Sequence, residues 1–279
     1  MGILHWLQRW LMAPRKAGKE TESYGRRFLS QSSYLSLGSL SFIILVSTWC
    51  LVTYGGLVQP YFLSSPTQVY EAAHNLLVMQ NYAGDIAASV IRIVVGFLAS
   101  AVLAIPLGIL IGRSQIFEAI FAPITSFVRY LPVPALLPFC ILWLGIGEVQ
   151  KISIVFVGVF FQLVLMIADI SRNIPPELLE IAYTLGTTPR MAIIRVVLPY
   201  SAPLIFDGLR ITLGWAWGWV MLAELVGASQ GIGYMILKSQ RYLLNANMIV
   251  GLLTVGLLGL ATDLLFAGLN RALFRWRQT

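Results

Sequence analysis

Charged side chains are scarce in this sequence of 279 residues: together they make up 11%, whereas 58% is hydrophobic. The mean hydropathy of +0.79 exceeds what a single soluble core of this length can hide, so the composition predicts an integral membrane protein. A net charge of +7 would suggest nucleic-acid binding in a soluble domain. Here the basic residues gather at the ends of apolar runs, as membrane orientation requires, and no nucleic-acid partner is expected.

Histidine and cysteine are also rare, with two of each. Cys50 and Cys140 lie far apart in apolar runs and belong to no Cys/His pattern, so neither a metal site nor a disulfide framework is indicated. His5 and His74 are predicted on opposite sides of the membrane, and no catalytic constellation is visible. The nucleotide-binding sequence G-x-x-x-x-G-K-[ST] does not occur, so any ATP must be hydrolysed by another chain.

Six apolar runs are long enough to cross a bilayer as helices. They cover residues 37–57, 86–111, 118–144, 152–170, 202–226 and 248–270. The connection over residues 58–85 contains no Lys or Arg, which marks the outside, whereas both termini and the loop between the fourth and fifth spans are basic. The positive-inside rule therefore places both termini in the cytosol of a multi-pass protein of the cytoplasmic membrane.

The segment before the first span, residues 1–36, is expected to be a cytosolic region separate from the membrane domain of residues 37–279. Residues 3–11 place their Ile, Trp and Leu side chains on one face, which predicts an amphipathic helix on the lipid surface; a frayed terminus is the alternative. Residues 13–36 are basic and Ser-rich and are expected to form a linker.

The loop between the fourth and fifth spans, residues 173–199, is too charged to enter the bilayer and is expected at the cytosolic surface. Two prolines favour the first turn of a helix, and Gly186 is typical of its end. A threonine then caps a second helix that begins at Pro189 and that Pro199 stops or kinks. We name this predicted helix–turn–helix, residues 173–199, the elbow.

The first helix of the elbow is predicted to be amphipathic. Its apolar face consists of Leu178, Ile181, Ala182 and Leu185. Glu177 and Glu180 fall on the opposite side, so one face is free for a partner. An interfacial helix without any partner is the alternative interpretation.

The elbow resembles the sequence E-A-A-x3-G-x9-I-x-L-P of ABC-importer permeases. The matching residues are Glu180, Ala182, Gly186, Leu198 and Pro199, with Ile181 and Val196 as apolar departures. In that family the loop is a coupling helix that docks on a cytosolic ATPase, so these five residues and Glu177 are the coupling candidates. The resemblance implies an all-α, six-span type I importer permease fold, with the coupling helix between spans four and five.

The same resemblance implies the partners. They are a second copy of the permease, two ATPase subunits that bind ATP and Mg²⁺, and an extracytoplasmic solute-binding protein. The permease itself then needs no cofactor and is not an enzyme. Transport would follow alternating access, in which ATP-driven closure of the ATPases opens the pathway outward.

The fifth span has a polar face inside the membrane. Residues spaced by three or four along it are Asp207, Arg210, Gly214, Trp217, Gly218, Met221 and Glu224. Such a face is too costly to turn toward lipid, so it is predicted to line a water-filled path or to face protein. In the alternative interpretation, Asp207 pairs with Arg210 one turn away and the glycines pack against a second copy.

The third span contains Pro132, Pro134 and Pro138, which preclude a regular helix for part of its length. This segment and the fifth span resemble the taurine, aliphatic-sulfonate and nitrate branch of the permeases. Trp215 and Trp219 are not expected from that branch.

Three intramembrane arginines suit an anionic solute, because a guanidinium offers paired donors and remains charged. With the polar face, the pathway candidates are Arg92, Arg129, Asp207, Arg210, Trp217, Met221 and Glu224. In the alternative interpretation the three arginines have structural roles. Arg92 snorkels to the membrane surface, Arg129 donates to carbonyls freed by Pro132, and Arg210 pairs with Asp207 or Asp263.

The sequence thus predicts an importer permease for a small organic or inorganic anion. The second interpretation is an ion-coupled secondary carrier, and an integral-membrane enzyme is a distant third. In the carrier, intramembrane carboxylates would be the proton or cation sites. These are Asp169, Asp207, Glu224 and Asp263.

Overall fold

The computed structural model describes residues 31–275 and divides the chain into two compact units, residues 1–72 and 73–279. The predicted N-terminal amphipathic helix, residues 3–11, lies outside the described residues. In the first unit, α2 (Gln31–Tyr54) begins before the predicted span, so the end of the expected linker is helical. The polar connection that follows also contains a helix, α3 (Pro66–Met79), whose sequence continues into the second unit.

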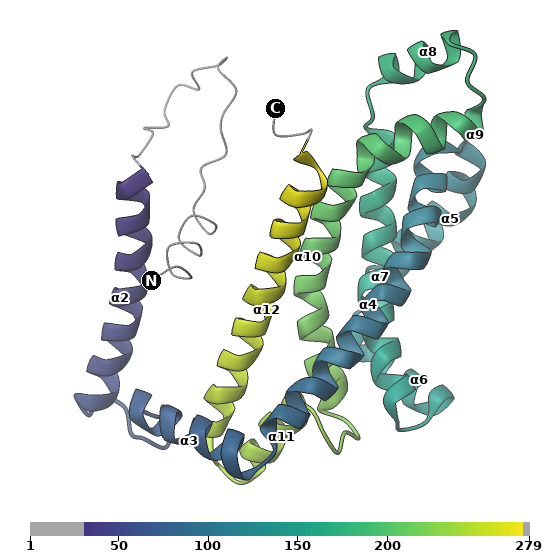
Figure 1. Cartoon of the computed structure of the whole chain (residues 1–279). Coiled ribbons are helices and arrows are strands. Elements are labelled where there is room, and N and C mark those ends of the chain that lie inside the picture. The colour runs from purple at the N-terminus through teal and green to yellow at the C-terminus, as the bar shows by residue number, and fades with distance from the viewer. Residues whose placement is uncertain (1–30, 276–279) are drawn as a thin grey trace. The chain divides into compact units, whose positions relative to one another are not determined.

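Four long helices form the body of the second unit (Figure 1). They are α4 (Tyr82–Arg113), α7 (Glu148–Arg172), α10 (Leu198–Glu224) and α12 (Asn245–Leu273). α4 packs on α7, α7 on α10 and α10 on α12, while the short helix α11 (Ile232–Arg241) lies against the beginning of α12. The core consists mainly of the buried apolar side chains of α4, α7 and α10.

Small residues spaced by four bring α4 into close contact with α7. They are Gly96, Ser100, Ala104, Gly108 and Gly112. A Cβ atom added to Gly108 would lie 2.8 Å from the carbonyl oxygen of Val164, so the two backbones nearly touch there. Ser100 donates a hydrogen bond of 3.0 Å to the carbonyl oxygen of Phe156 across the same interface. This small-xxx-small stripe joins the two helices by packing rather than by charge.

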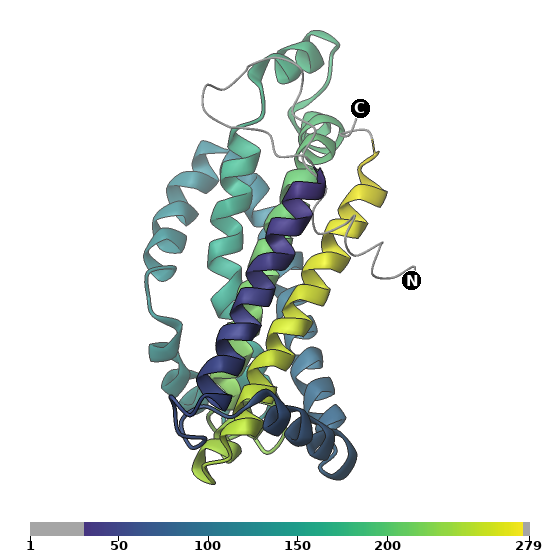
Figure 2. The same cartoon turned by 90° about the vertical axis from the view of Figure 1, so that its left-hand side faces the viewer.

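The predicted third span is broken into α5 (Gln115–Val128) and α6 (Val133–Leu144), which are bent by 99° relative to each other. The prediction that prolines interrupt this span is confirmed: α5 ends at Val128, and Pro132 is the residue before α6. Pro134 instead lies in the first turn of α6, where a missing N–H has no partner to lose, and Pro138 lies within α6. In Figure 2 the break is roughly midway along the neighbouring long helices.

The elbow forms α8 (Pro176–Thr184), α9 (Pro189–Ala192) and a π-helical turn, η1 (Ile193–Val197). Gly186 has φ of +80°, as expected for a residue that ends a helix, and the Thr188 hydroxyl accepts the Met191 N–H at 3.4 Å. The second helix of the elbow is not stopped at Pro199, but it turns between α9 and α10, as Figure 1 shows, so the predicted kink is confirmed. α9, η1 and α10 follow one another without a break, because the wider π turn accommodates the missing N–H of the proline.

Within residues 31–275, five helices are long and apolar enough to cross a membrane, and the broken pair α5–α6 makes a sixth span if it is counted as one. The boundaries agree closely with the predicted spans. The predicted all-α membrane fold is therefore confirmed, with the difference that the third span is bent.

Candidate functional site

α8 projects from one end of the second unit and exposes an apolar surface (Figure 1). Leu178, Ile181 and Leu185 are exposed by 37%, 58% and 79%, whereas Ala182, predicted on the same face, is buried in the elbow. Glu177 and Glu180 are exposed as well. In the described chain nothing covers these three apolar side chains, so α8 offers an apolar face bordered by two carboxylates.

The remaining coupling candidates shape the elbow rather than the exposed surface of α8. An added Cβ at Gly186 would meet no atom within 4 Å, so glycine is required there by its positive φ and not by lack of space. Leu198 and Pro199 start α10 and are exposed. All the predicted coupling residues thus lie on one continuous segment.

The polar face of α10 meets α12. Arg210 forms a bidentate ion pair with Asp263. The indole N–H of Trp217 donates a hydrogen bond of 3.3 Å to the hydroxyl of Thr262. Asp207 accepts a hydrogen bond of 2.6 Å from Asn270. The alternative prediction that Asp207 and Arg210 pair with each other is therefore wrong, because both side chains extend across the helix interface instead.

Gly214 and Gly218 lie on the exposed part of the same face. An added Cβ at either glycine would meet no atom within 4 Å, so these positions support no helix contact within the described chain. Whether the face lines a pathway or packs on a second copy stays a prediction.

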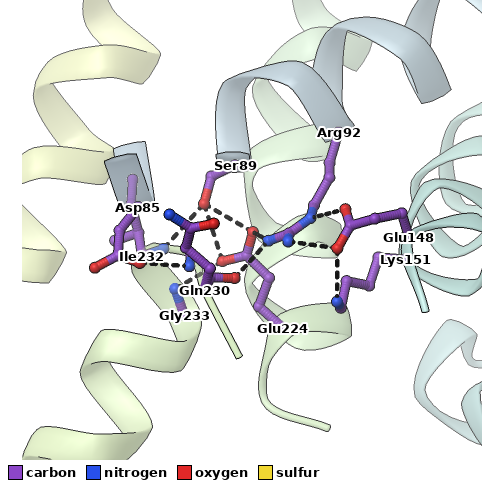
Figure 3. Close-up of polar contacts among 10 residues, drawn as sticks. Asp85, Ser89, Arg92, Glu148, Lys151, Glu224, Gln230, Ile232 and Gly233 are labelled. Carbon is purple, nitrogen blue, oxygen red and sulfur yellow. Dashed lines mark hydrogen bonds and ion pairs between the residues drawn. The ribbon is translucent and has the colours of Figure 1, made fainter. Parts of the chain in front are cut away.

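A cluster of charges centred on Arg92 joins α4 to the start of α7 and the end of α10 (Figure 3). Arg92 and Glu224 are buried, whereas the side chain of Glu148 is 58% exposed. The Arg92 side chain is 4% exposed and donates to Glu224 at 2.7 Å and to both carboxylate oxygens of Glu148 at 2.6 and 2.7 Å. Lys151 also donates to Glu148, at 2.9 Å. The prediction that Arg92 snorkels is wrong, since its partners come from α7 and α10 and hold it inside.

The same cluster fixes the segment between α10 and α11. Glu224 is fully buried and accepts from the Ser89 hydroxyl at 2.7 Å and from the Gly233 N–H at 2.8 Å. Asp85 accepts the Gly231 N–H at 2.8 Å (Figure 3). Gly231 has φ of +131° and leaves no room for a side chain beside Glu224, so this chain position requires glycine.

The other two pathway candidates lie elsewhere. Met221 is partly buried near α11, and its carbonyl lies beside Gly233. Arg129 is exposed at the break between α5 and α6, where its guanidinium donates to the Tyr130 hydroxyl at 2.9 Å and covers the Tyr130 ring. No carbonyl freed by Pro132 is among its hydrogen-bond partners in the described residues, so that expectation is wrong.

Two of the cavities in the second unit have charged residues in their lining. One, of about 330 Å³, is lined by α4, α11 and the start of α12 and includes Asp85 and Lys238. The other, of about 430 Å³, lies at the α5–α6 break against α7 and α10 and includes Arg129. The structure therefore places the predicted site residues in four separate groups: the elbow, the α10–α12 pairs, the Arg92 cluster and the α5–α6 cavity.

Sequence reasoning missed several residues of these groups as partners. No partner role was predicted for Glu148 and Lys151, while Ser89, Asn270 and Thr262 carried no signal because single polar residues in apolar runs are common. Their partners are distant in sequence, which the chain alone does not reveal.

Comparison with known proteins assigns the family. The model of the family described as the inner membrane component of binding-protein-dependent transport systems matches residues 104–275. The chain belongs to this family. The resemblance predicted from the elbow is confirmed, and the permease is a transport component rather than a catalytic subunit.

Curated relatives cover most of the permease. A probable ABC transporter permease of Brucella abortus is 36% identical over 88% of this chain and 96% of its own length. The putative aliphatic sulfonates transport permease SsuC of Bacillus subtilis is 31% identical over 85% of this chain and 86% of its own. The taurine transport permease TauC of Escherichia coli is 30% identical over 89% and 91%.

A solved structure shares the fold of the permease. The inward-facing MetNI methionine ABC transporter contains a chain that aligns with a TM-score of 0.58 at 21% identity, over 68% of the permease and 96% of that chain. At this identity the likeness concerns the fold alone.

Proposed function

We propose that the permease is the membrane-spanning subunit of an ATP-driven importer for a small organic or inorganic anion. It works as a pair of copies with two cytosolic ATPase subunits and an extracytoplasmic solute-binding protein, and both its termini are cytosolic. The observation that carries this proposal is the exposed apolar face of α8. An uncovered apolar patch bordered by charge is typical of a protein interface.

The connection of α8 to the membrane supports a coupling role. Gly186 turns the chain from α8 into α9, and α9 continues through η1 into α10. A partner that moves α8 therefore acts on a helix that crosses the whole membrane. The ATPase can therefore move α10 without touching any residue of the pathway.

The engaged carboxylates favour an importer over an ion-coupled carrier. Glu224 is paired with Arg92, Asp263 with Arg210, and Asp169 lies 3.4 Å from Arg172. Asp207 accepts from Asn270. A carrier needs carboxylates that release and rebind an ion, and these four already have partners within the described chain.

Glu180→Ala is expected to weaken ATPase docking about tenfold or more, because a charge-assisted hydrogen bond to the partner is lost. Gly186→Leu is expected to break coupling, since a left-handed conformation costs a branched side chain about 1–2 kcal/mol and the turn would change direction. The measurements are co-purification of the ATPase and ATP hydrolysis stimulated by loaded binding protein in vesicles.

Two variants serve as controls. Glu118→Ala removes another exposed carboxylate, paired only with Arg172, and should leave docking unchanged. Gly186→Asn should retain coupling, because asparagine tolerates a positive φ. If Glu180→Ala and Gly186→Leu both keep the ATPase and full stimulated turnover, α8 is not the coupling element and the proposal fails.

The orientation of the permease is tested by cysteine labelling. In a chain with Cys50 and Cys140 replaced by serine, a cysteine at exposed Glu71 should react with a membrane-impermeant maleimide in intact cells, and one at exposed Glu180 should not. Both should react after permeabilisation. The opposite pattern would reverse the topology.

A further inference from the structure

The cavity at the α5–α6 break lies where binding sites of transporters with broken helices are found. It has a volume of about 430 Å³, within the range of small-molecule sites. The break lies roughly midway along the neighbouring helices, and the N-terminus of α6 borders it (Figure 2). Interrupted helices expose backbone groups and the positive end of a helix dipole near the membrane midplane, which favours an anion there.

Arg129 is the one intramembrane arginine of the three candidates that no carboxylate neutralises in the described chain. Arg92 is held by Glu148 and Glu224, and Arg210 by Asp263. Arg129 bonds only to the hydroxyl of Tyr130, which leaves most of its N–H groups for another acceptor. Arg129 therefore supplies this cavity with a positive charge that can bind an anion. The charges of Arg92 and Arg210 are already paired with carboxylates.

Two further polar side chains, Gln162 and Trp219, line the cavity. The indole N–H of Trp219 is buried without a hydrogen-bond partner within residues 31–275. Gln162 lines the cavity and its amide bonds to no other described residue. None of the lining residues is acidic. A ligand with several acceptor oxygens would accept from Arg129 and from the Gln162 amide, and a cationic group would find no carboxylate.

The rest of the lining is aromatic and aliphatic. Trp215, Trp219, Phe161 and Tyr130 supply rings, and prolines and aliphatic side chains complete the wall. Gly158 is needed for this arrangement, because an added Cβ would lie 2.6 Å from the Trp219 ring. Such a wall favours an apolar body beside the anionic group.

We propose that this cavity is the solute site of the permease, and that it takes an organic monoanion with an apolar alkyl or aryl body, such as a sulfonate or carboxylate. The proposal rests on the proposed importer function. It disfavours nitrate, which has no apolar part to meet the rings, and taurine, whose ammonium group lacks an acidic partner here.

The test uses the permease–ATPase complex in nanodiscs without the binding protein. The probe is 4-nitrobenzenesulfonate, whose nitroaromatic ring quenches indole fluorescence on contact. We expect saturable quenching that is lost in the variant Trp215→Phe with Trp219→Phe. 1-Butanesulfonate should displace the probe at concentrations about tenfold or more below those required of nitrate or taurine.

Two arginine variants test whether the positive charge that binds the probe is that of Arg129. Arg129→Gln should raise the probe Kd about tenfold or more, because a charge-assisted contact is lost. Arg113→Gln is the matched control: Arg113 ends α4 and donates to the Ser171 carbonyl, and its replacement should leave the Kd unchanged. Gly158→Ala should weaken probe binding by displacing the Trp219 ring while the complex remains assembled.

The proposal is overturned if the wild-type complex shows no saturable quenching, if nitrate or taurine displaces the probe as well as 1-butanesulfonate does, or if Arg129→Gln and Arg113→Gln bind equally. These outcomes leave the importer function intact as long as Gly186→Leu uncouples the ATPase. Failure of the elbow variants to uncouple would instead remove the importer function itself.

Discussion

Arg92→Ala is expected to destabilise the permease by about 3 kcal/mol or more, because it leaves the fully buried carboxylate of Glu224 without its ion-pair partner. Glu148 and the backbone carbonyl of Gln230 lose donors in the same variant. The loss should appear as a large drop in the thermal unfolding midpoint of the purified protein in detergent. It should also appear as proteolysis in the segment between α10 and α11, which the cluster holds in place.

A double-mutant cycle separates the pair from its surroundings. Arg92→Met combined with Glu224→Met removes both buried charges and should be less destabilised than the sum of the two single variants. Arg113→Ala, which loses one bond to a backbone carbonyl, should have an effect within about 1 kcal/mol of wild type. Strictly additive effects of the two methionine variants would show that the Arg92–Glu224 pair does not couple α4 to α10.

Gly108→Leu is expected to separate α4 from α7 and to destabilise the permease by about 3 kcal/mol or more. A Cβ at this position would lie 2.7 Å from the side chain of Ile167 and 2.8 Å from the Val164 carbonyl, so backbone must move. Helices in lipid are held together largely by such close packing, and no apolar driving force replaces it. The expected readouts are low yield of folded protein and a lowered unfolding midpoint.

The matched control is Gly256→Leu on α12, where an added Cβ meets no atom within 4 Å. Both variants exchange an intramembrane helical glycine for the same side chain, so helix propensity and hydropathy change equally. If Gly108→Leu folds as well as Gly256→Leu does, the contact between α4 and α7 is not tight.

The spans and the elbow were predictable because both have strong local signals. Long apolar runs define each helix, and Gly186 and Pro189 mark the turn inside a charged loop. The bend of the third span was only partly predictable. Its three prolines indicated an interruption, but a proline in a first helical turn and one at a break look alike in sequence.

The ion pairs were only partly predictable. Asp207 and Asp263 were both possible partners of Arg210, and the sequence could not decide between them. Asp207 and Arg210 are one turn apart and seemed natural partners, yet each bonds to α12. Helix packing decides this choice, since it brings Asp263 and Asn270 opposite the two residues. Arg92 was predicted to line the pathway or, alternatively, to snorkel, because its position near a span end was visible but Glu148 and Glu224 beside it were not.

The small residues of α4 illustrate a signal that was present and not used. Five of them recur at intervals of four from Gly96 to Gly112, a longer run than the pair Gly214 and Gly218 that drew attention. The longer run is the tight interface, and the shorter pair contacts nothing in the described chain. The number of small residues that recur at intervals of four was therefore the better indicator of which helix face packs against another helix.

The helix that follows the elbow makes the permease a lever. The 27 residues of α10 correspond to a rod about 40 Å long, with the elbow attached at one end and the carboxylate of Glu224 at the other. If such a rod tilts by about 5° around its middle, each end moves by about 2 Å in opposite directions. That displacement is comparable to a hydrogen-bond length, so a push on the elbow that rocks this rod cannot leave the bonds of Glu224 to Arg92 and Gly233 unchanged unless α4 and α11 move with it.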